Sequence, residues 1–206
     1  MITVVTEKNR AECEALMRDL FTVRYELFVE GRGWRALERP DRLDIDQYDT
    51  HETVYIIKQI DGVIVGGARL RPTVVPHMLD EVFGDLCEGG HPPIGPNIYE
   101  CSRTFVARRH KQRAAIFAEV LLTAAEYCVT NGIVKLTGIL EPWWLNSYLR
   151  LGLNAMPLGM PQATDDMTLL AVAFDVDAVV RDSLERQVEA LRRVGVRRVR
   201  EVGHAA

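Results

Sequence analysis

The chain has 206 residues, of which 48% are hydrophobic and 26% are charged, the composition of an ordinary globular protein with a sizeable core. This length suits a single domain over residues 1–206. The formal net charge of −4 gives no bulk affinity for polyanions, so no nucleic-acid partner is expected. No apolar run reaches the length that spans a bilayer, so no membrane partner is expected either.

The four cysteines and the N-terminus indicate the compartment. The cysteine spacing matches no metal site, so we predict no bound metal. The first ten residues lack the apolar stretch of a secretory leader, which favours a cytoplasmic protein with reduced thiols. The cysteines are Cys13, Cys87, Cys101 and Cys128.

Hydrophobic periodicity predicts the elements of the first half of the chain. Asp61-Gly62 is a strong two-residue hairpin signal between two apolar runs. The expected elements are a strand over 2–6, a helix over 10–28, a charged loop over 30–50, strands over 53–60 and 63–71, a short helix over 76–86 and a turn-rich loop over 88–96.

The second half alternates between strand and helix patterns. Asn131-Gly132 ends a helical pattern in the manner of a C-cap. The expected elements are a strand over 97–107, a helix over 114–130, a strand over 133–140, a short helix over 142–151, a strand over 167–174 and an amphipathic C-terminal helix over 178–202, whose apolar stripe is clearest up to residue 194.

This order predicts an α/β (α+β) fold. A hairpin followed by β–α–β units implies a mixed sheet with helices on both faces. A doubly wound dinucleotide fold is disfavoured, because no G-x-G-x-x-G follows a first strand and the hairpin breaks the alternation.

Several charged residues occupy positions that a helix or strand usually keeps apolar, and three aspartates form a dense acidic cluster in the expected loop over 30–50. Buried charges must be paired or functional, so the pattern predicts a network of arginines and carboxylates. The alternative is a set of surface ion pairs around a solvated sheet edge. The residues concerned are Arg24, Arg69 and Arg103 on one side, and Asp44, Asp46, Asp49 and Glu100 on the other.

The expected strand over 97–107 carries the candidates for catalysis. Glu100 and Ser102 share one face, and Arg103 points to the other unless a bulge intervenes. A carboxylate among apolar neighbours can act as a general base near neutral pH, although Glu100 could instead pair with an arginine. Ser102 could be a nucleophile, but no histidine lies nearby in sequence, so a Ser-His-Asp triad has little support.

A basic stretch precedes the expected helix over 114–130. Positive side chains at a helix N-terminus can bind the phosphates of a carrier, although an exposed basic turn explains them equally well. The residues are Arg108, Arg109, Lys111 and Arg113. The C-terminal helix also carries many arginines, but acidic residues are mixed among them, which favours a solvated face over a nucleic-acid surface.

Four motifs resemble those of the LuxI-type acyl-homoserine lactone synthases, over a match from the first strand to about Phe174. Arg24, Phe28 and Trp34 lie within RYELFVEGRGW. An acidic motif follows at residues 44–49, where Asp44 replaces the family's usual Glu. The next two are RLRPT at 69–73 and ECSR at 100–103.

The resemblance implies a fold similar to that of the GNAT acyltransferases, a three-layer αβα sandwich with a twisted, mostly antiparallel sheet. It also implies the reaction. The amine of S-adenosylmethionine attacks an acyl thioester, and the methionyl carboxylate then displaces the sulfonium substituent, which closes the lactone and releases methylthioadenosine. Both molecules are substrates, and no cofactor is implied. The product is a quorum-sensing autoinducer.

The resemblance and the chemistry together assign roles to residues. Glu100 is the expected base, with Ser102 and Arg103 beside it in the catalytic set and backbone N–H groups there as oxyanion donors. An acyl pocket is expected near Trp143, Trp144, Met156 and Met160, and bulky tryptophans would favour a short, branched or aryl acyl group. The residues expected to bind S-adenosylmethionine are Arg24, Phe28, Trp34, Asp46, Asp49, Arg69 and Arg103.

Several alternatives stay open from the sequence. The donor is either acyl-CoA or acyl carrier protein, since both would use a basic patch. The stretch 109–114 lacks the central glycine of the usual GNAT pyrophosphate loop, which weakens the case for an ordinary acetyl-CoA site. Another function is a GNAT-like N-acyltransferase acting on a different amine, and a further one is a non-catalytic thioester- or nucleotide-binding regulator.

Overall fold

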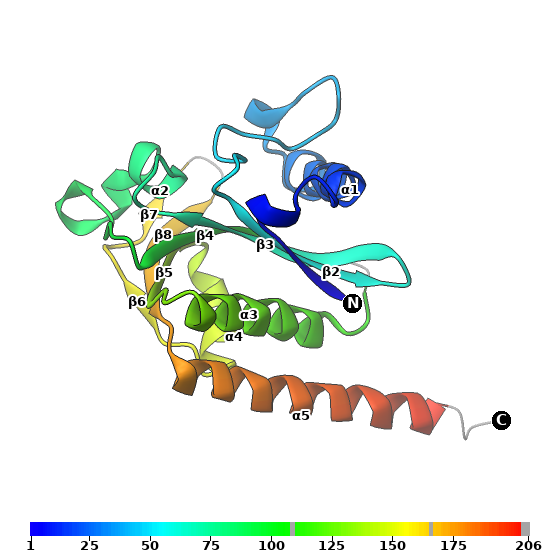
Figure 1. Cartoon of the computed structure of the whole chain (residues 1–206). Coiled ribbons are helices and arrows are strands. Elements are labelled where there is room, and N and C mark those ends of the chain that lie inside the picture. Colours follow the sequence, from blue (N-terminus) through cyan, green and yellow to red (C-terminus); the bar gives the residue numbers. More distant parts are fainter. Residues whose placement is uncertain (108–109, 165–166, 203–206) are drawn as a thin grey trace.

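A mixed β-sheet runs through the molecule (Figure 1). The computed structural model describes residues 1–107, 110–164 and 167–202, with side chains up to residue 193. Within that part of the chain the sheet order is β1-β2-β3-β4-β5-β8-β6, and β7 pairs with β8. The strands are β1 (Ile2–Val5), β2 (Val54–Ile60), β3 (Val63–Pro72), β4 (Ile98–Val106), β5 (Lys135–Leu140), β6 (Ala155–Pro157), β7 (Gln162–Ala163) and β8 (Thr168–Asp175).

The hairpin joining β2 and β3 forms at the predicted place. Asp61 and Gly62 both have positive φ, 50° and 79°, as a two-residue turn of type I′ requires. All described strand pairs are antiparallel except β4 with β5, which are parallel. The predicted mixed, mostly antiparallel sheet is therefore confirmed.

A bulge interrupts β4 where it pairs with β3. Arg69 lies opposite Ser102 and Gly67 lies opposite Phe105, so β4 has one more residue than β3 over this stretch. Arg103 takes up the extra length with a φ of 51°, which is uncommon for a residue other than glycine. The bulge changes the simple alternation of side chains, so Arg103 reaches the same acidic loop as Arg69. This is the exception that the sequence analysis allowed.

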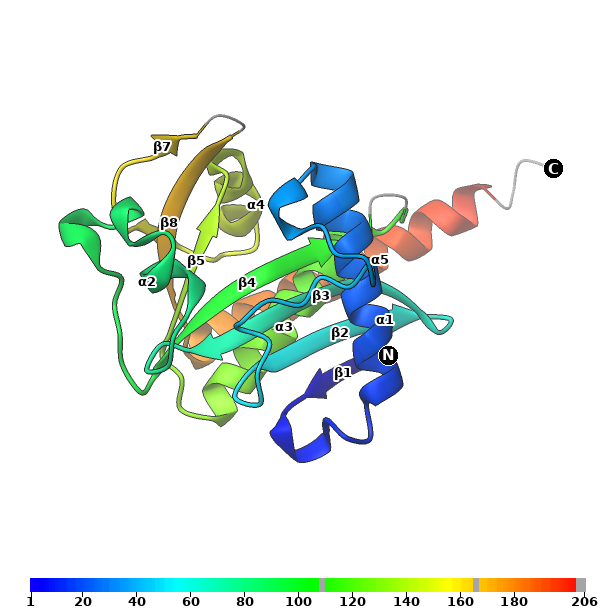
Figure 2. The same ribbon diagram turned by 90° about the horizontal axis from the view of Figure 1, so that it is seen from above.

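The parallel strands β4 and β5 stay together only briefly. They are in register at Ile98–Lys135, Tyr99–Leu136 and Glu100–Thr137, and then diverge (Figure 2). Gly138 lies at the end of this contact, where an added Cβ would stand 2.7 Å from the carbonyl oxygen of Cys101. Beyond Glu100, the edge of β4 that faces β5 has no partner strand.

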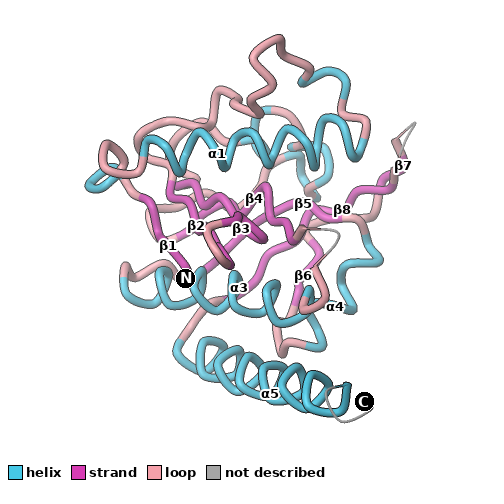
Figure 3. Tube along the Cα trace, turned by 90° about the vertical axis from the view of Figure 1, so that its right-hand side faces the viewer, coloured by secondary structure: helices cyan, strands magenta, loops and turns pink. Residues whose placement is uncertain are grey.

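Helices cover both faces of the sheet (Figures 1 and 3). α1 lies on one face, α3 lies on the other, and α5 packs against the outer side of α3. The larger core lies between the sheet, α3 and α5, and a second core lies under α1. The predicted three layers are present, with α5 outside them. The helices are α1 (Glu14–Arg24), α2 (Met78–Glu81), α3 (Arg113–Thr130), α4 (Leu145–Arg150) and α5 (Ala178–Val202).

Some predicted elements differ in the structure. The helix expected over 10–28 starts at Glu14 and changes at Tyr25–Glu30 (η2) into a π-helical turn, in which each turn holds an additional residue. The helix expected over 76–86 is two short pieces, α2 and a 3₁₀ turn at Gly84–Leu86. β6 and β7 were missed, because strands of three and two residues are too short to show a pattern. Over the described residues, no helix combines the length and apolarity needed to cross a membrane.

Candidate functional site

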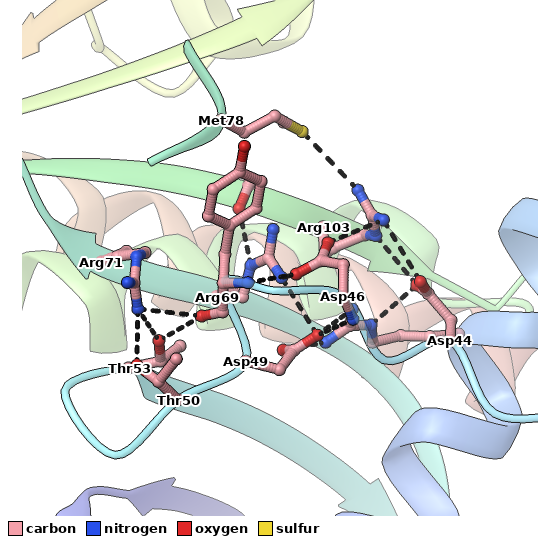
Figure 4. Close-up of polar contacts among 12 residues, drawn as sticks. Asp44, Asp46, Asp49, Thr50, Thr53, Arg69, Arg71, Met78 and Arg103 are labelled. Atoms are coloured by element: carbon pink, nitrogen blue, oxygen red, sulfur yellow. Dashed lines mark hydrogen bonds and ion pairs between the residues drawn. The ribbon is translucent and has the colours of Figure 1, made fainter. Parts of the chain in front are cut away.

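The predicted charge network exists and is buried. The acidic loop between α1 and β2 lies against the sheet, where arginines from three different elements bind it (Figure 4). Arg24 comes from the end of α1, Arg69 from β3 and Arg103 from the bulge in β4. Their exposed fractions are 1%, 1% and 8%. The alternative of solvated surface ion pairs is therefore wrong.

Each arginine contacts two of the three aspartates. Arg24 donates to Asp44 from Nε at 2.9 Å and to both oxygens of Asp49 at 2.8 and 3.0 Å. Arg69 Nη1 reaches Asp46 at 2.6 Å and Asp49 at 3.1 Å. Arg103 binds Asp44 through Nε at 2.8 Å and Asp46 through Nη2 at 3.1 Å. Three positive charges thus meet three negative ones.

The arginines keep Asp44 and Asp49 ionised. Burial tends to raise the pKa of Asp44, but the hydrogen bond from Arg103 and the charges of Arg24 and Arg103 outweigh burial and hold this pKa below its ordinary value. Burial also opposes ionisation of Asp49, and the charges of Arg24 and Arg69 lower its pKa far below the usual range. The loop is therefore fixed by charge-assisted hydrogen bonds, which are stronger than neutral ones.

Residues outside the predicted set complete the support of the loop. Arg71 donates from Nη1 to the Tyr48 carbonyl at 3.0 Å and to Thr50 Oγ1 at 2.7 Å. The Tyr55 hydroxyl donates to Asp49 at 3.0 Å. Arg71 could have been found from the sequence, since it shares a strand face with Arg69. The role of Tyr55 could not be predicted in this way, because its place in an apolar run indicates an ordinary core residue of β2.

A large cavity of about 760 Å³ opens beside the network. Its wall combines the segment from η2 to the turn at residues 35–37, the acidic loop, α2 and the residues after it, the divergent part of β4, and the 3₁₀ turn Pro142–Trp144 with α4. The predicted site residues that line it are Phe28, Trp34, Asp46, Glu100, Ser102, Arg103 and Trp144. Arg24, Asp49 and Arg69 do not line it, and they lie behind the wall that they help to hold.

Glu100 is held in a specific orientation at this wall. Its side chain is 1% exposed, and Oε2 accepts a hydrogen bond from the Leu79 backbone N–H at 2.6 Å. Oε1 is buried and has no hydrogen-bond partner. Buried polar atoms are nearly always hydrogen-bonded, so a carboxylate oxygen without a partner beside a cavity indicates a position for a ligand donor. Among the described ion pairs, none involves Glu100, which argues against its alternative role as an arginine partner.

A pair of aromatic rings lies beside the acidic loop in the wall of the large cavity. Phe28 and Trp34 stack with their ring centroids 5.1 Å apart. The guanidinium of Arg103 lies 5.6 Å from the Phe28 centroid and 5.3 Å from that of Trp34. The π-helical turn η2 places Phe28 here, and Trp34 follows at the start of the 3₁₀ turn η3 (Arg35–Leu37). These rings and Asp46 together form a wall suited to a cation.

A second, smaller cavity of about 90 Å³ lies where β4 and β5 have separated. Residues 101–104 line both cavities, as do Ile139, Leu140 and Tyr148. The rest of the small cavity is mostly apolar and comes from β5, α3, β8, α5 and the residues that follow α4 and β8. Burial raises the pKa of the Cys101 thiol to about 11, so this residue stays a neutral thiol in the wall near neutral pH.

Other predicted residues lie elsewhere. Trp143 is 58% exposed and stacks on Trp144, and its indole N–H donates to Glu141 at 2.9 Å. Met156 lies in β6 outside the lining of both cavities, and Met160 is 81% exposed. The tryptophan pair therefore contributes one ring to the large cavity rather than two.

The basic stretch is only partly described. Arg108 and Arg109 lie outside the described residues. Lys111 and Arg113 are exposed at the beginning of α3. In the part of the chain that the structure describes, no group of three or more His, Cys, Asp or Glu side chains is arranged to hold a metal ion.

Comparison with known proteins identifies the family. A family model described as autoinducer synthase matches residues 7–184. The chain belongs to this family. It is 34% identical over 188 residues to an isovaleryl-homoserine lactone synthase of Bradyrhizobium diazoefficiens, a match that covers 91% of this chain and 85% of that relative. The predicted LuxI-type resemblance and the acyltransferase activity of an acyl-homoserine lactone synthase are confirmed.

Solved structures agree with the sequence relatives. The CoA-dependent acyl-homoserine lactone synthase BjaI, with SAM and isopentyl-CoA, superposes with a TM-score of 0.87 at 33% identity, covering 92% of this chain and 89% of that one. A Lactobacillus plantarum protein assigned as an N-acetyltransferase matches at 16% identity, with a TM-score of 0.55 and coverage of 85% and 99%. That second likeness shows the fold alone, and it is the GNAT-like fold that the sequence predicted.

Proposed function

We propose that this synthase transfers a short, branched acyl group from a coenzyme A thioester to the amine of S-adenosylmethionine and then closes the lactone. The observation that carries the proposal is the Glu100 carboxylate. One of its oxygens is fixed by the Leu79 N–H, and the other is buried without a partner in a residue that lines the large cavity. A fixed carboxylate with a free oxygen suits a base that accepts a proton from the substrate ammonium, directly or through one water.

The large cavity suits the acceptor substrate. S-Adenosylmethionine carries a sulfonium and an ammonium, which favour aromatic faces and carboxylates. The Phe28–Trp34 stack and Asp46 offer both in one wall. Arg24 and Arg69 are paired with the aspartates behind the cavity and act by holding this wall. Of the three arginines in the network, Arg103 is the one that lines the cavity, where it can meet a substrate carboxylate.

The small cavity suits the acyl group. An engineered cavity of about 150 Å³ accepts benzene, so the 90 Å³ here fits a tail of about four carbons, the size of the isobutyl tail of an isovaleryl group. The comparisons support this size, since they include an isovaleryl-homoserine lactone synthase and a structure solved with isopentyl-CoA. The volume of the small cavity, rather than the Trp143–Trp144 pair, is the support for a short branched acyl chain.

The reaction balances without a further cofactor. The neutral amine attacks the thioester carbonyl, the C–S bond breaks, and the thiol leaves as the amide forms. Backbone N–H groups on the unpaired edge of β4, beside Ser102 and Arg103, are placed to stabilise the oxyanion. The methionyl carboxylate then attacks its own γ-carbon, and the sulfonium leaves as methylthioadenosine. Both substrates are made in the cytoplasm, where we expect the enzyme to act.

The test is mass spectrometry of the purified chain with S-adenosylmethionine and a panel of acyl-CoA and acyl-carrier-protein thioesters. We expect acyl-homoserine lactone with equimolar methylthioadenosine, and the highest kcat/KM with isovaleryl-CoA. Glu100→Gln should lower kcat by a factor of about 100 to 10,000, the usual contribution of a general base. Glu119→Gln is the matched control, because Glu119 is also buried but pairs with Lys58 and Arg192 on the far side of the sheet.

The outcomes separate the alternatives. Acylated amine without methylthioadenosine would make the chain a plain N-acyltransferase. Product from carrier-protein thioesters alone would overturn the coenzyme A donor but not the reaction. Equal kcat values for Glu100→Gln and Glu119→Gln, both folded, would remove Glu100 from the mechanism.

A further inference from the structure

We propose that the C-terminal helix α5 sets the length of the acyl chain, with Leu184 as the specificity-determining residue. This inference rests on the proposed function, because it assumes that the small cavity receives the acyl group. The family assignment does not supply it. It comes from the side chains that close the cavity in this chain.

The small cavity extends from the β4–β5 opening to α5. At the opening it is lined by residues 101–104, which follow Glu100 and also line the large cavity. At α5 it is lined by Val180 and Leu184. α5 lies outside α3, on the side of the sheet away from α1 (Figure 3). Because residues 101–104 at the other end line both cavities, Val180 and Leu184 form the far end of the small cavity. An acyl tail that enters between β4 and β5 therefore grows towards Leu184.

Leu184 is fixed in place from two sides. It is 1% exposed and belongs to the main core. Just before it, Ser183 packs so closely on the turn after α4 that a Cβ on Gly152 would stand 2.7 Å from the Ser183 hydroxyl. Further along α5, Arg192 binds Glu119 of α3 at 2.7 Å, and Glu119 also binds Lys58 of β2 at 2.6 Å. A helix held at both places cannot retreat easily from a longer acyl chain.

A wall of this kind discriminates by chain length. Each additional methylene that finds apolar space gains about 0.8 kcal/mol of transfer free energy, or roughly fourfold in kcat/KM. Without space it gains nothing and strains the packing. Leu184→Ala removes three carbons at the end of the cavity, which provides room for two or three methylenes of an octanoyl tail.

The experiment measures kcat/KM for isovaleryl-CoA and octanoyl-CoA in the full-length chain. We expect Leu184→Ala to raise the octanoyl-to-isovaleryl ratio on the order of tenfold, the value of about two methylenes. Val188→Ala is the matched control, since Val188 lies one turn further along α5, is 2% exposed in the same core and lines neither cavity. It should lower the melting temperature while leaving the ratio unchanged.

A second variant acts in the opposite direction and keeps the test independent of a loss of stability. Ala124 of α3 lines the same cavity and is 1% exposed. Ala124→Val should fill part of the space and shift the preference towards butyryl-CoA over isovaleryl-CoA, by about the fourfold of one methylene. If Leu184→Ala does not fold, Leu184→Val removes one carbon at the same place and should still raise the octanoyl-to-isovaleryl ratio by about fourfold. An unchanged ratio in that variant overturns the proposal.

The results distinguish this inference from the proposed function. Wild-type protein that makes no lactone from any thioester overturns both. Wild-type protein that makes lactone, together with a Leu184→Ala variant of unchanged ratio, overturns the inference alone. The same conclusion follows if Val188→Ala shifts the ratio as much as Leu184→Ala, or if Ala124→Val leaves the preference unchanged.

Discussion

Replacing Asp49 by asparagine tests whether the buried charge network stabilises the acidic loop. The Asp49 carboxylate accepts hydrogen bonds from Arg24 at 2.8 and 3.0 Å and from Tyr55 at 3.0 Å, and it pairs with Arg69 at 3.1 Å. Its side chain is fully buried. Asn keeps the shape but removes one negative charge, which leaves three buried arginines facing two aspartates.

The expected cost is large for a single substitution. Breaking a buried ion pair from one side costs about 3–5 kcal/mol, because the remaining charge stays buried without compensation. For a chain of this length, that lowers the melting temperature by on the order of 10 °C. Urea unfolding followed by circular dichroism measures the free energy of unfolding directly.

The matched control is Asp175→Asn. Asp175 pairs with Lys135 at the surface, and its side chain is 65% exposed. Exposed pairs contribute roughly 0–1 kcal/mol, so this change should be nearly neutral. If Asp49→Asn costs no more than Asp175→Asn, the network does not stabilise the fold and the reasoning fails.

Two further predictions concern the same region. The pKa values of Asp44 and Asp49 lie below their unfolded values, so their contribution to stability is complete above about pH 5 and is lost as the pH falls towards the folded pKa values. As the pH is lowered past about 4, the urea concentration at which half of the wild-type protein unfolds should therefore decrease, and it should decrease less for Asp49→Asn. Parallel plots of this concentration against pH for the two proteins would contradict the prediction. Trp34→Ala should raise the KM for S-adenosylmethionine about thirtyfold with little change in kcat, since a desolvated cation–π contact is worth about 2 kcal/mol. Trp143→Ala, at an exposed ring outside both cavities, should leave that KM unchanged, and equal effects would remove Trp34 from the substrate site.

The fold was predictable where sequence patterns are long and regular. The hairpin at Asp61-Gly62 and the helix that begins near residue 114 follow from turn chemistry and a 3.6-residue period, which are local properties. The π-helical turn at Tyr25–Glu30 was not, because its residues fit an α-helical row equally well. Tertiary packing decided between the two.

The sequence predicted which residues belong to the site, but not which of them line the cavity and which support its wall from behind. Arginines in apolar rows and a dense acidic cluster in a loop identified Arg24, Arg69 and the aspartates, and the network confirms that they meet. Only the geometry distinguishes those that line the cavity, such as Asp46, from those behind it. The hydrogen bond from Leu79 to Glu100 uses a backbone group, which carries no sequence signal.

The short parallel contact between β4 and β5 limits how tightly the two parts of the sheet are joined. One part is β1-β2-β3-β4 and the other is β5-β8-β6. Three residue pairs are in register between β4 and β5, whereas the other neighbouring strand pairs from β1 to β8 have four to seven. Few main-chain hydrogen bonds therefore hold the two parts together, and α3 packs against both of them. The separation of β4 from β5, and with it the shape of both cavities, therefore depends mainly on side-chain packing in the core under α3.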